Sequence, residues 1–311
     1  LAPFGPERAS ARMVRAWAMA FKGTIQDARA EAAVAWDEGG LASRVEIALE
    51  LADLETWFGS LGEAQAALDR VPQYGALDAD QAEQRVLCEI GLALRTGDLA
   101  TAETLLAPLR LGAPSTASAM QARRLAMRAH IAILRSDPAA DTHVEAALTQ
   151  ARAQRADFWT KYLTAVRTLS TSADRVRGAL RLHDPETITY LAVHAEQLLR
   201  WVPELLDQNE ADLDEVVNAF PGRWREALRA ELQATPGSKQ ARAWIAGHLD
   251  TIGEKADIPL LRRAAKTLPA PSGKQPYGKG LARRLADPVR IHDLNRVIVH
   301  VGDRVLAGSD V

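Results

Sequence analysis

The residues that come nearest to a nucleotide-binding motif lie at 273–280, in the sequence Gly-Lys-Gln-Pro-Tyr-Gly-Lys-Gly. Two glycines and a lysine at this spacing are typical of a phosphate-binding loop, in which backbone N–H groups and the lysine hold phosphate oxygens. Gly280, however, stands where that motif needs a serine or threonine for Mg²⁺, and Pro276 lacks a backbone N–H. No apolar strand precedes the segment either. We therefore predict a linker here, without nucleotide hydrolysis.

Other residue types that support catalysis or metal binding are scattered along the chain. The seven histidines include no pair spaced four residues apart, as a metal-binding helix would carry, and Cys88 is the single cysteine. No Gly-x-Ser-x-Gly motif offers a nucleophile. The acidic group at 212–215 is typical of a helix start, whose dipole favours negative charge. The pairs His183-Asp184 and His292-Asp293 are interpreted as loop and cap residues. We predict no enzyme activity, no metal site and no cofactor.

Charge is distributed unevenly along the 311 residues. The formal net charge of -2 argues against nucleic-acid binding by the chain as a whole. Between Lys255 and Arg284, however, eight basic residues stand against one acidic residue, Asp257. Basic side chains of this kind contact phosphates without reading base sequence. We predict such phosphate contacts from Lys274, Lys279, Arg283 and Arg284.

Composition indicates a cytoplasmic protein. The chain is 47% hydrophobic and 25% charged, which is ordinary for a soluble folded protein. One cysteine cannot form an internal disulfide, which fits a reducing compartment. No apolar stretch approaches the ~18 residues of a membrane span, and the first residues lack the apolar core of a signal peptide. Because the sequence starts without methionine and stops abruptly at Val311, we expect it to be a piece of a longer protein.

A recurring pattern organises the N-terminal third. An apolar helical stretch is followed by Gly, any residue, an apolar residue, two further residues and Ala, and then by a second helical stretch. We identify the pattern at 23–28, 62–67 and 97–102, so that its glycines are 39 and 35 residues apart. Glycine accepts the positive φ that ends a helix, and a small alanine lets two helices approach closely. We therefore expect Gly62 in a turn, and Ala67 and Ala102 at tight contacts between helices.

These residues resemble the tetratricopeptide (TPR) repeat, whose period is ~34 residues. The resemblance covers about residues 8–110, with a degenerate fourth unit near 121–155, and it departs from the family pattern where Ile25, Ala64 and Leu99 replace an aromatic residue. It implies that the first helix of each pair lines a groove for a protein or peptide partner. The lysines and asparagines with which some TPR proteins hold a peptide carboxylate are not visible. The groove residues predicted in this way are Trp17, Phe21, Thr56, Leu87, Leu94 and Arg95. The alternative is a plain helical bundle.

The rest of the chain changes character twice. The middle stays helical and resembles HEAT repeats near its end, and a Pro/Gly-rich stretch follows. The β-branched run 297–301 can then pair with 304–306 across Gly302-Asp303 as a hairpin. The predicted fold class is all-α: a TPR/HEAT-like α-solenoid with a short C-terminal β-hairpin. The predicted domains are TPR-like repeats at 1–155, HEAT-like repeats at 156–268, a basic linker at 269–288 and the hairpin at 289–311. Four tryptophans are expected to fill the helical core: Trp159, Trp201, Trp224 and Trp244.

The C-terminal stretch carries a more specific resemblance. The sequences GLARRL at 280–285, LNRV at 294–297 and VGDRVLAG at 301–308 resemble a junction in AfsR/SARP-type bacterial transcription regulators. In that family, helical repeats lead into the first strands of a winged helix, and a bacterial transcriptional activator domain follows. The resemblance implies that the repeats sense a partner and control DNA binding, with the DNA-reading helices beyond Val311.

Two other classes of function stay open. The chain could be a TPR/HEAT scaffold or adaptor with an unrelated β appendage and no link to DNA. It could also belong to an NTPase whose phosphate loop would lie upstream of Leu1. The residues beyond Val311 distinguish the first alternative from the regulator, because a regulator needs a basic, DNA-reading helix there.

Overall fold

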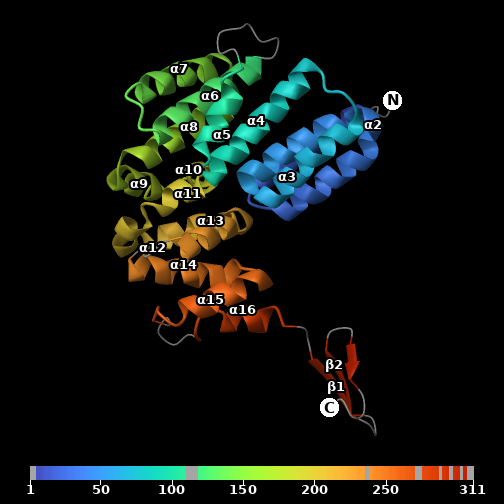
Figure 1. Ribbon diagram of the computed structural model, residues 1–311, viewed down its shortest axis with the longest axis vertical. Coiled ribbons are helices and arrows are strands. Elements are labelled where there is room, and N and C mark those ends of the chain that lie inside the picture. Colours follow the sequence, from blue (N-terminus) through green and yellow to red (C-terminus); the bar gives the residue numbers. More distant parts are fainter. Residues whose placement is uncertain are drawn as a thin grey trace. The chain divides into compact units, whose positions relative to one another are not determined.

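The computed structural model describes residues 5–109, 118–234, 238–269, 275–286, 289–293, 297–301 and 304–306. They are helical almost throughout, which confirms the all-α fold class (Figure 1). The chain forms two compact units: unit 1 ends at Ala227 and unit 2 begins at Leu228. This division falls within a helix, and the repeat boundary predicted after residue 155 stays a prediction.

Unit 1 is built from helices that follow one another with short turns. Its elements are α1 (Gly5–Phe21), α2 (Ile25–Phe58), α3 (Leu61–Arg70), η1 (Val71–Tyr74), α4 (Ala79–Thr96), α5 (Leu99–Leu106), α6 (Ser118–Leu134), α7 (Ala140–Ala153), α8 (Asp157–Thr171), α9 (Ala173–Leu180), α10 (Pro185–Val193), α11 (Ala195–Leu199), α12 (Val202–Ala219) and α13 (Pro221–Ala234), which continues into unit 2. Gly40, with a φ of 64°, divides α2 into two helical halves. From α1 to α9 each helix packs on its successor, and α2, α4, α6 and α8 also contact one another in that order (Figure 1).

The recurring pattern is real, but its second copy was misplaced by three residues. Gly23 and Gly97 end helices with positive φ values of 80° and 74°, as expected. Gly62 does not: it is the second residue of α3, because the Ser60 side chain accepts a hydrogen bond from the Glu63 N–H and starts that helix earlier. The turn glycine is Gly59, so the pattern of this copy runs from 59 to 64.

With this register the three copies share one residue pattern, although Gly59 has a φ of -115° where Gly23 and Gly97 have positive values. Each has a glycine, a residue at the start of the helix, an apolar residue, two further residues and an alanine, and the glycines are 36 and 38 residues apart. The alanines of the three copies, Ala28, Ala64 and Ala102, are all 0% exposed. The expected close helix contacts are therefore present, and Ala67, one turn further along α3, is buried as well.

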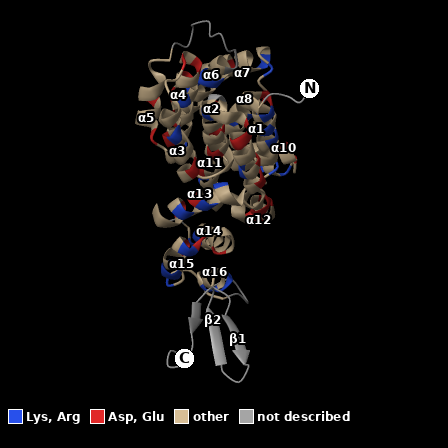
Figure 2. Cartoon of the chain, turned by 90° about the vertical axis from the view of Figure 1, so that its right-hand side faces the viewer, with Lys and Arg blue, Asp and Glu red and all other residues tan. Residues whose placement is uncertain are grey.

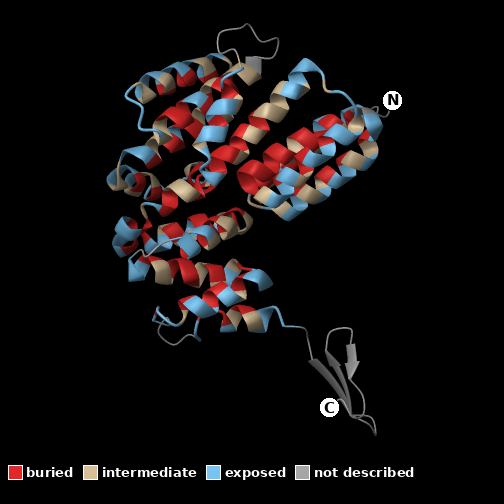
Figure 3. Cartoon of the chain, in the orientation of Figure 1, coloured by how far each residue is buried: buried red, intermediate tan, exposed pale blue. Residues whose placement is uncertain are grey.

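The core of unit 1 is a continuous layer of buried Ala, Leu and aromatic side chains along the helices (Figure 3). Trp224 is completely buried and Trp244, in unit 2, nearly so, which confirms the expected core role of these two tryptophans. Trp159 and Trp201 are only half-buried. The Trp201 indole N–H donates to the Leu169 carbonyl at 2.5 Å, so a polar contact as well as packing fixes its position.

Unit 2 contains the end of α13, then α14 (Lys239–Ile252), η2 (Lys255–Asp257), α15 (Ile258–Ala264) and α16 (Lys279–Arg284). The linker interpretation is wrong for residues 275–286, because they form a turn and a helix that pack on α14 and α15. Tyr277 and Leu281 are buried, and the Asp250 carboxylate accepts the Gly278 N–H at 2.9 Å. The burial of Tyr277 and Leu281 thus fixes this segment on unit 2, although its Pro/Gly composition is typical of a linker. Residues 270–274 and 287–288 lie outside the described part.

Three short strands end the described chain: β1 (Val289–Asp293), β2 (Val297–Val301) and β3 (Arg304–Leu306). They pair antiparallel in the order β1-β2-β3, with Val289 opposite Val301 and Val301 opposite Arg304. The expected turn residues Gly302 and Asp303 lie outside the described residues, so the hairpin stays a prediction. β1 was not expected, and the loop interpretation of His292-Asp293 is wrong, because both residues pair within β1.

Candidate functional site: the inner face of unit 1 and the basic surface of unit 2

The predicted groove lies on the inner face of unit 1, and aromatic side chains fill this face. Phe21 of α1 packs on Phe58 of α2, with ring centroids 4.8 Å apart, and on Phe158 of α8 at 5.9 Å. Phe58 in turn contacts Phe220, at the end of α12, at 5.8 Å. Helices more than a hundred residues apart in sequence therefore share one core. We call it the aromatic cluster: Trp17, Phe21, Trp57, Phe58, Phe158, Tyr162, Tyr190 and Phe220.

The turn after α1 and the end of α12 also touch through their backbones. A Cβ atom added to Gly23 would lie 2.1 Å from the Ala219 carbonyl oxygen. This is far inside van der Waals contact, so glycine is needed here for close approach as well as for its positive φ. The turn after α1 therefore lies directly against the end of α12 within unit 1.

The groove assignment from the sequence is therefore wrong for most of its residues. Trp17 and Phe21 are half-buried within the aromatic cluster. The other four are buried and face helices of unit 1, so they cannot contact a partner in this conformation. Their exposed fractions are 0% for Thr56, 0% for Leu87, 7% for Leu94 and 6% for Arg95. The prediction assumed the open curvature of a peptide-binding array, whereas α8, α10 and α12 cover this face.

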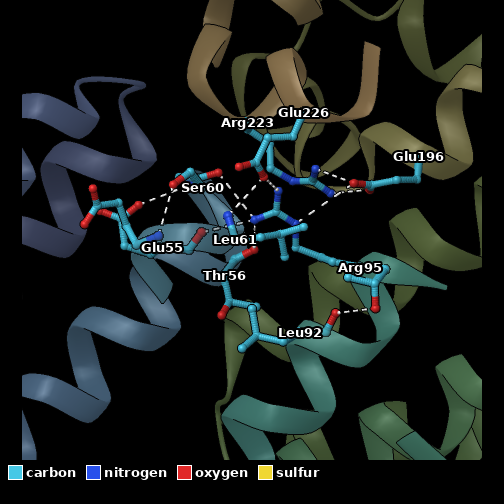
Figure 4. Close-up of polar contacts among 12 residues, drawn as sticks. Glu55, Thr56, Ser60, Leu61, Leu92, Arg95, Glu196, Arg223 and Glu226 are labelled. Carbon is cyan, nitrogen blue, oxygen red and sulfur yellow. Dashed lines mark hydrogen bonds and ion pairs between the residues drawn. The ribbon is translucent and has the colours of Figure 1, made fainter. Parts of the chain in front are cut away.

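Arg95 forms the centre of a buried ionic network (Figure 4). Its Nη1 donates to three backbone carbonyls at the end of α2: those of Glu55 at 3.2 Å, Thr56 at 2.9 Å and Gly59 at 3.3 Å. Its Nη2 donates to Glu226 Oε2 at 3.2 Å, and the same oxygen accepts the Leu61 N–H at 3.0 Å. Arg95 therefore satisfies helix-end carbonyls of α2, while Glu226 of α13 satisfies a helix-start donor of α3.

Two further pairs complete this network. Arg223 donates to the Val193 carbonyl at 2.8 Å and to both carboxylate oxygens of Glu196. Arg29 donates to Glu55 Oε1 at 2.5 Å and Oε2 at 2.7 Å. We call these six residues the ionic cluster: Arg29, Glu55, Arg95, Glu196, Arg223 and Glu226.

Burial governs the charges in the ionic cluster. Desolvation, and then the positive charge of Arg223, lowers the pKa of Arg95 to about 9, so the guanidinium stays charged at neutral pH. Burial alone would raise the pKa of Glu196, but the charge and hydrogen bonds of Arg223 outweigh it and lower that pKa. Three arginines face three glutamates, so the cluster has no surplus charge for an anionic ligand. Its geometry serves to hold the helices of unit 1 together.

Two further sets of buried polar side chains in unit 1 are also paired internally. Arg123 donates to both oxygens of Asp53, at 2.6 and 2.5 Å, beside the Cys88 thiol. Burial raises the pKa of Cys88 well above its usual value, so the thiol is not an activated nucleophile. His130 Nδ1 lies 2.5 Å from the Tyr162 hydroxyl, and burial lowers the pKa of His130 to about 3. These groups stay neutral or paired at pH 7.

The described residues contain no group of three or more His, Cys, Asp or Glu side chains that could hold a metal ion. Within the same ranges, none of the helices combines the length and the apolar character needed to span a bilayer.

The phosphate-contact residues predicted from the sequence lie in unit 2. Lys279, Arg283 and Arg284 are exposed on α16, whereas Lys274 falls outside the described residues. Arg262, Arg263 and Lys266, on α15 and directly after it, are exposed as well. Figure 2 shows the blue segments of basic residues on α15 and α16. Sequence reasoning counted these three as local basic charge but did not assign them to the site. We call the six side chains the basic surface: Arg262, Arg263, Lys266, Lys279, Arg283 and Arg284.

Comparisons of the chain with protein-family models, with characterised proteins and with solved structures give no match.

Proposed function

We propose that this chain is the helical-repeat region of a bacterial transcription regulator of the AfsR/SARP type, joined to the first strands of its winged-helix DNA-binding domain. The observation that carries the proposal is the order of parts along the chain. A helical unit with a self-filled inner face is followed by a unit with an exposed basic surface. The strands β1–β3 then lie in the residues that resemble the start of the winged helix.

Within this proposal, α1–α7 are TPR-like helix pairs and α8–α15 are HEAT-like, so that the helices form a solenoid. The uniform spacing of the turns at Gly23, Gly59 and Gly97 supports the first assignment. The solenoid differs from an open peptide-binding array because the aromatic and ionic clusters fill its inner face. A protein or effector that regulates the molecule therefore acts on its outer helices or by opening these clusters. The buried, unreactive Cys88 fits a cytoplasmic location.

The proposal is tested with the natural protein extended past Val311 to its end. A pool of random duplex DNA is bound to it, and the retained fragments are sequenced over several rounds. The expected result is enrichment of one sequence motif, because the extension supplies an element that can enter the major groove.

The 311-residue chain is the matched control, and it should retain DNA weakly and without an enriched motif. The absence of any enriched motif with the extended protein would contradict the regulator proposal and favour the scaffold or adaptor alternative. Enrichment by the 311-residue chain alone would mean that the DNA-reading element lies within it.

A further inference from the structure

Unit 2 has an excess of basic residues, and many of them are exposed. In its described part before β1, residues 228–234, 238–269 and 275–286, ten lysines and arginines face only four acidic residues. Exposed charges normally occur with both signs interspersed, so such an excess produces a positive potential that attracts polyanions.

Three of the four acidic side chains make contacts within unit 2. The Asp250 carboxylate accepts the backbone N–H groups of Gly278 at 2.9 Å and Leu281 at 3.3 Å, and so fixes the start of α16. Asp257 is completely buried and accepts from Arg229 at 2.5 Å, while Glu254 lies 3.8 Å from the same arginine. The carboxylates keep their charge in these contacts, and the excess of six positive charges (ten basic minus four acidic residues) remains in this part of the unit.

The basic surface is where this excess gathers. One side of α15 is buried through Leu260, Leu261 and Ala264. The two arginines between them, Arg262 and Arg263, face solvent. Gly278 packs against α15, since an added Cβ would lie 3.2 Å from Arg262 Cγ, so α16 begins beside that arginine. Among the described residues, none of these five side chains forms an ion pair: Arg262, Arg263, Lys266, Lys279 and Arg283.

We propose that the basic surface binds the phosphate backbone of duplex DNA next to the site read by the winged helix, without reading sequence itself. Guanidinium groups suit this role because they bind phosphate oxygens bidentately and never lose their charge. The inference rests on the proposed function, because it takes the strands as the start of the DNA-reading domain.

The length of the connection makes the proposal specific. Arg284 is five residues before Val289, the first residue of β1. Five residues span at most about 18 Å, which corresponds to about five base pairs of flanking duplex at ~3.4 Å each. Because this reach keeps the basic surface close to β1, we expect it to contact phosphates in the duplex that directly flanks the specific site.

The test uses the extended protein, its enriched DNA site and titrations at several salt concentrations. In one variant the five unpaired cations of the basic surface are replaced together by glutamine, as Arg262→Gln, Arg263→Gln, Lys266→Gln, Lys279→Gln and Arg283→Gln. A control variant removes the same charge from exposed positions of unit 1, as Arg15→Gln, Lys22→Gln, Arg70→Gln, Arg152→Gln and Arg155→Gln. Circular dichroism checks that both variants are folded.

The basic-surface variant should lower the slope of log K against log salt by about 0.9 for each lost phosphate contact. The ratio of specific to non-specific affinity should stay unchanged, because phosphate contacts carry no sequence information. Duplexes with fewer than about five base pairs on one or the other side of the site are then compared. On the side that the basic surface contacts, this shortening should lower the DNA affinity of the wild-type protein and leave the affinity of the variant unchanged. The control variant should keep the wild-type slope.

The possible failures can be told apart. If the extended protein enriches no DNA sequence, the proposed function fails. If it does, but the two variants have the same salt slope and the same response to flank length, the inference alone is overturned. Binding of the basic surface to poly-glutamate as tightly as to DNA would also overturn it, and would indicate an acidic protein partner.

Discussion

The buried arginines of the ionic cluster in unit 1 and the arginines of the basic surface in unit 2 have opposite environments. In unit 1, Arg95 and Arg223 are 6% and 1% exposed and are held by carboxylates and backbone carbonyls. In unit 2, the arginines of α15 and α16 are exposed, and most of the acidic side chains near them are engaged elsewhere. Arginine thus holds helices together in the ionic cluster, whereas on the basic surface its charge faces solvent. Net charge, which sums over both, conceals the difference.

The largest change in stability is expected from the loss of Arg95 in the ionic cluster. Arg95→Met should lower the free energy of unfolding by about 3–5 kcal/mol, because Glu226 and three carbonyls would lose their partner inside the protein. The same substitution at Arg283 in unit 2 should change it by no more than about 0.5 kcal/mol. Urea unfolding followed by circular dichroism measures both. Equal costs at the two positions would contradict the assignment of different roles.

Acid should weaken unit 1 through its buried imidazoles. Burial lowers the pKa values of His130, to about 3, and of His194. The unfolded chain therefore takes up protons first, and the stability present above pH 6.5 is lost as the pH falls. Each imidazole should cost up to about 1.4 kcal/mol per pH unit below 6.5. Unfolding free energies at pH 7 and pH 5 measure the loss, and the double variant His130→Gln, His194→Gln should lose less. An equal loss in the double variant would show that other groups titrate.

A smaller effect tests the close approach of helices in unit 1. Ala102 is 0% exposed on α5, so Ala102→Leu should overpack this contact and cost about 1–3 kcal/mol. Ala100 lies on the exposed side of the same helix, and Ala100→Leu should be nearly neutral. Urea midpoints of the two variants distinguish them, and coinciding midpoints would show that the contact is loose.

The smallest effects test the register of the repeats. Gly97→Ala should cost about 1–2 kcal/mol, because φ is positive at this position. Gly62→Ala should instead stabilise the protein by about 0.5–1 kcal/mol, because Gly62 is helical and an added Cβ meets no atom within 4 Å. The melting temperatures of the two variants, compared with the wild-type protein, measure both effects. A loss of stability at Gly62 would restore the register first read from the sequence.

The sequence predicted local features well. Helix-ending glycines such as Gly23 and Gly97 follow from backbone sterics, and the burial of Ala102 follows from its distance to the turn. The second turn was misplaced because Gly59 and Gly62 both fit the pattern. The choice between them depends on Ser60, whose side chain caps α3. A closer comparison of the residues after each glycine would have found the uniform register.

The contacts between distant helices of unit 1 could not be predicted in the same way. Arg95 and Glu226 are 131 residues apart in the sequence, and Phe21 meets Phe158 and Tyr190 only after several helices have packed. Helical periodicity shows which side of a helix is apolar but not which distant helix covers it. The one available signal was the group Phe158, Trp159 and Tyr162 on α8, whose aromatic density exceeds what a solvent-facing groove needs.

The most direct measurement of the central claim is lysine footprinting of the extended protein with and without its DNA site. The chain has lysines in both units: Lys22 and Lys161 in unit 1, and Lys266 and Lys279 on the basic surface. Acetylation followed by mass spectrometry gives the reactivity of each. The account predicts that DNA protects Lys266 and Lys279 and leaves Lys22 and Lys161 unchanged. Protection of the unit 1 lysines, or unchanged reactivity of Lys266 and Lys279 in the DNA complex, would contradict it.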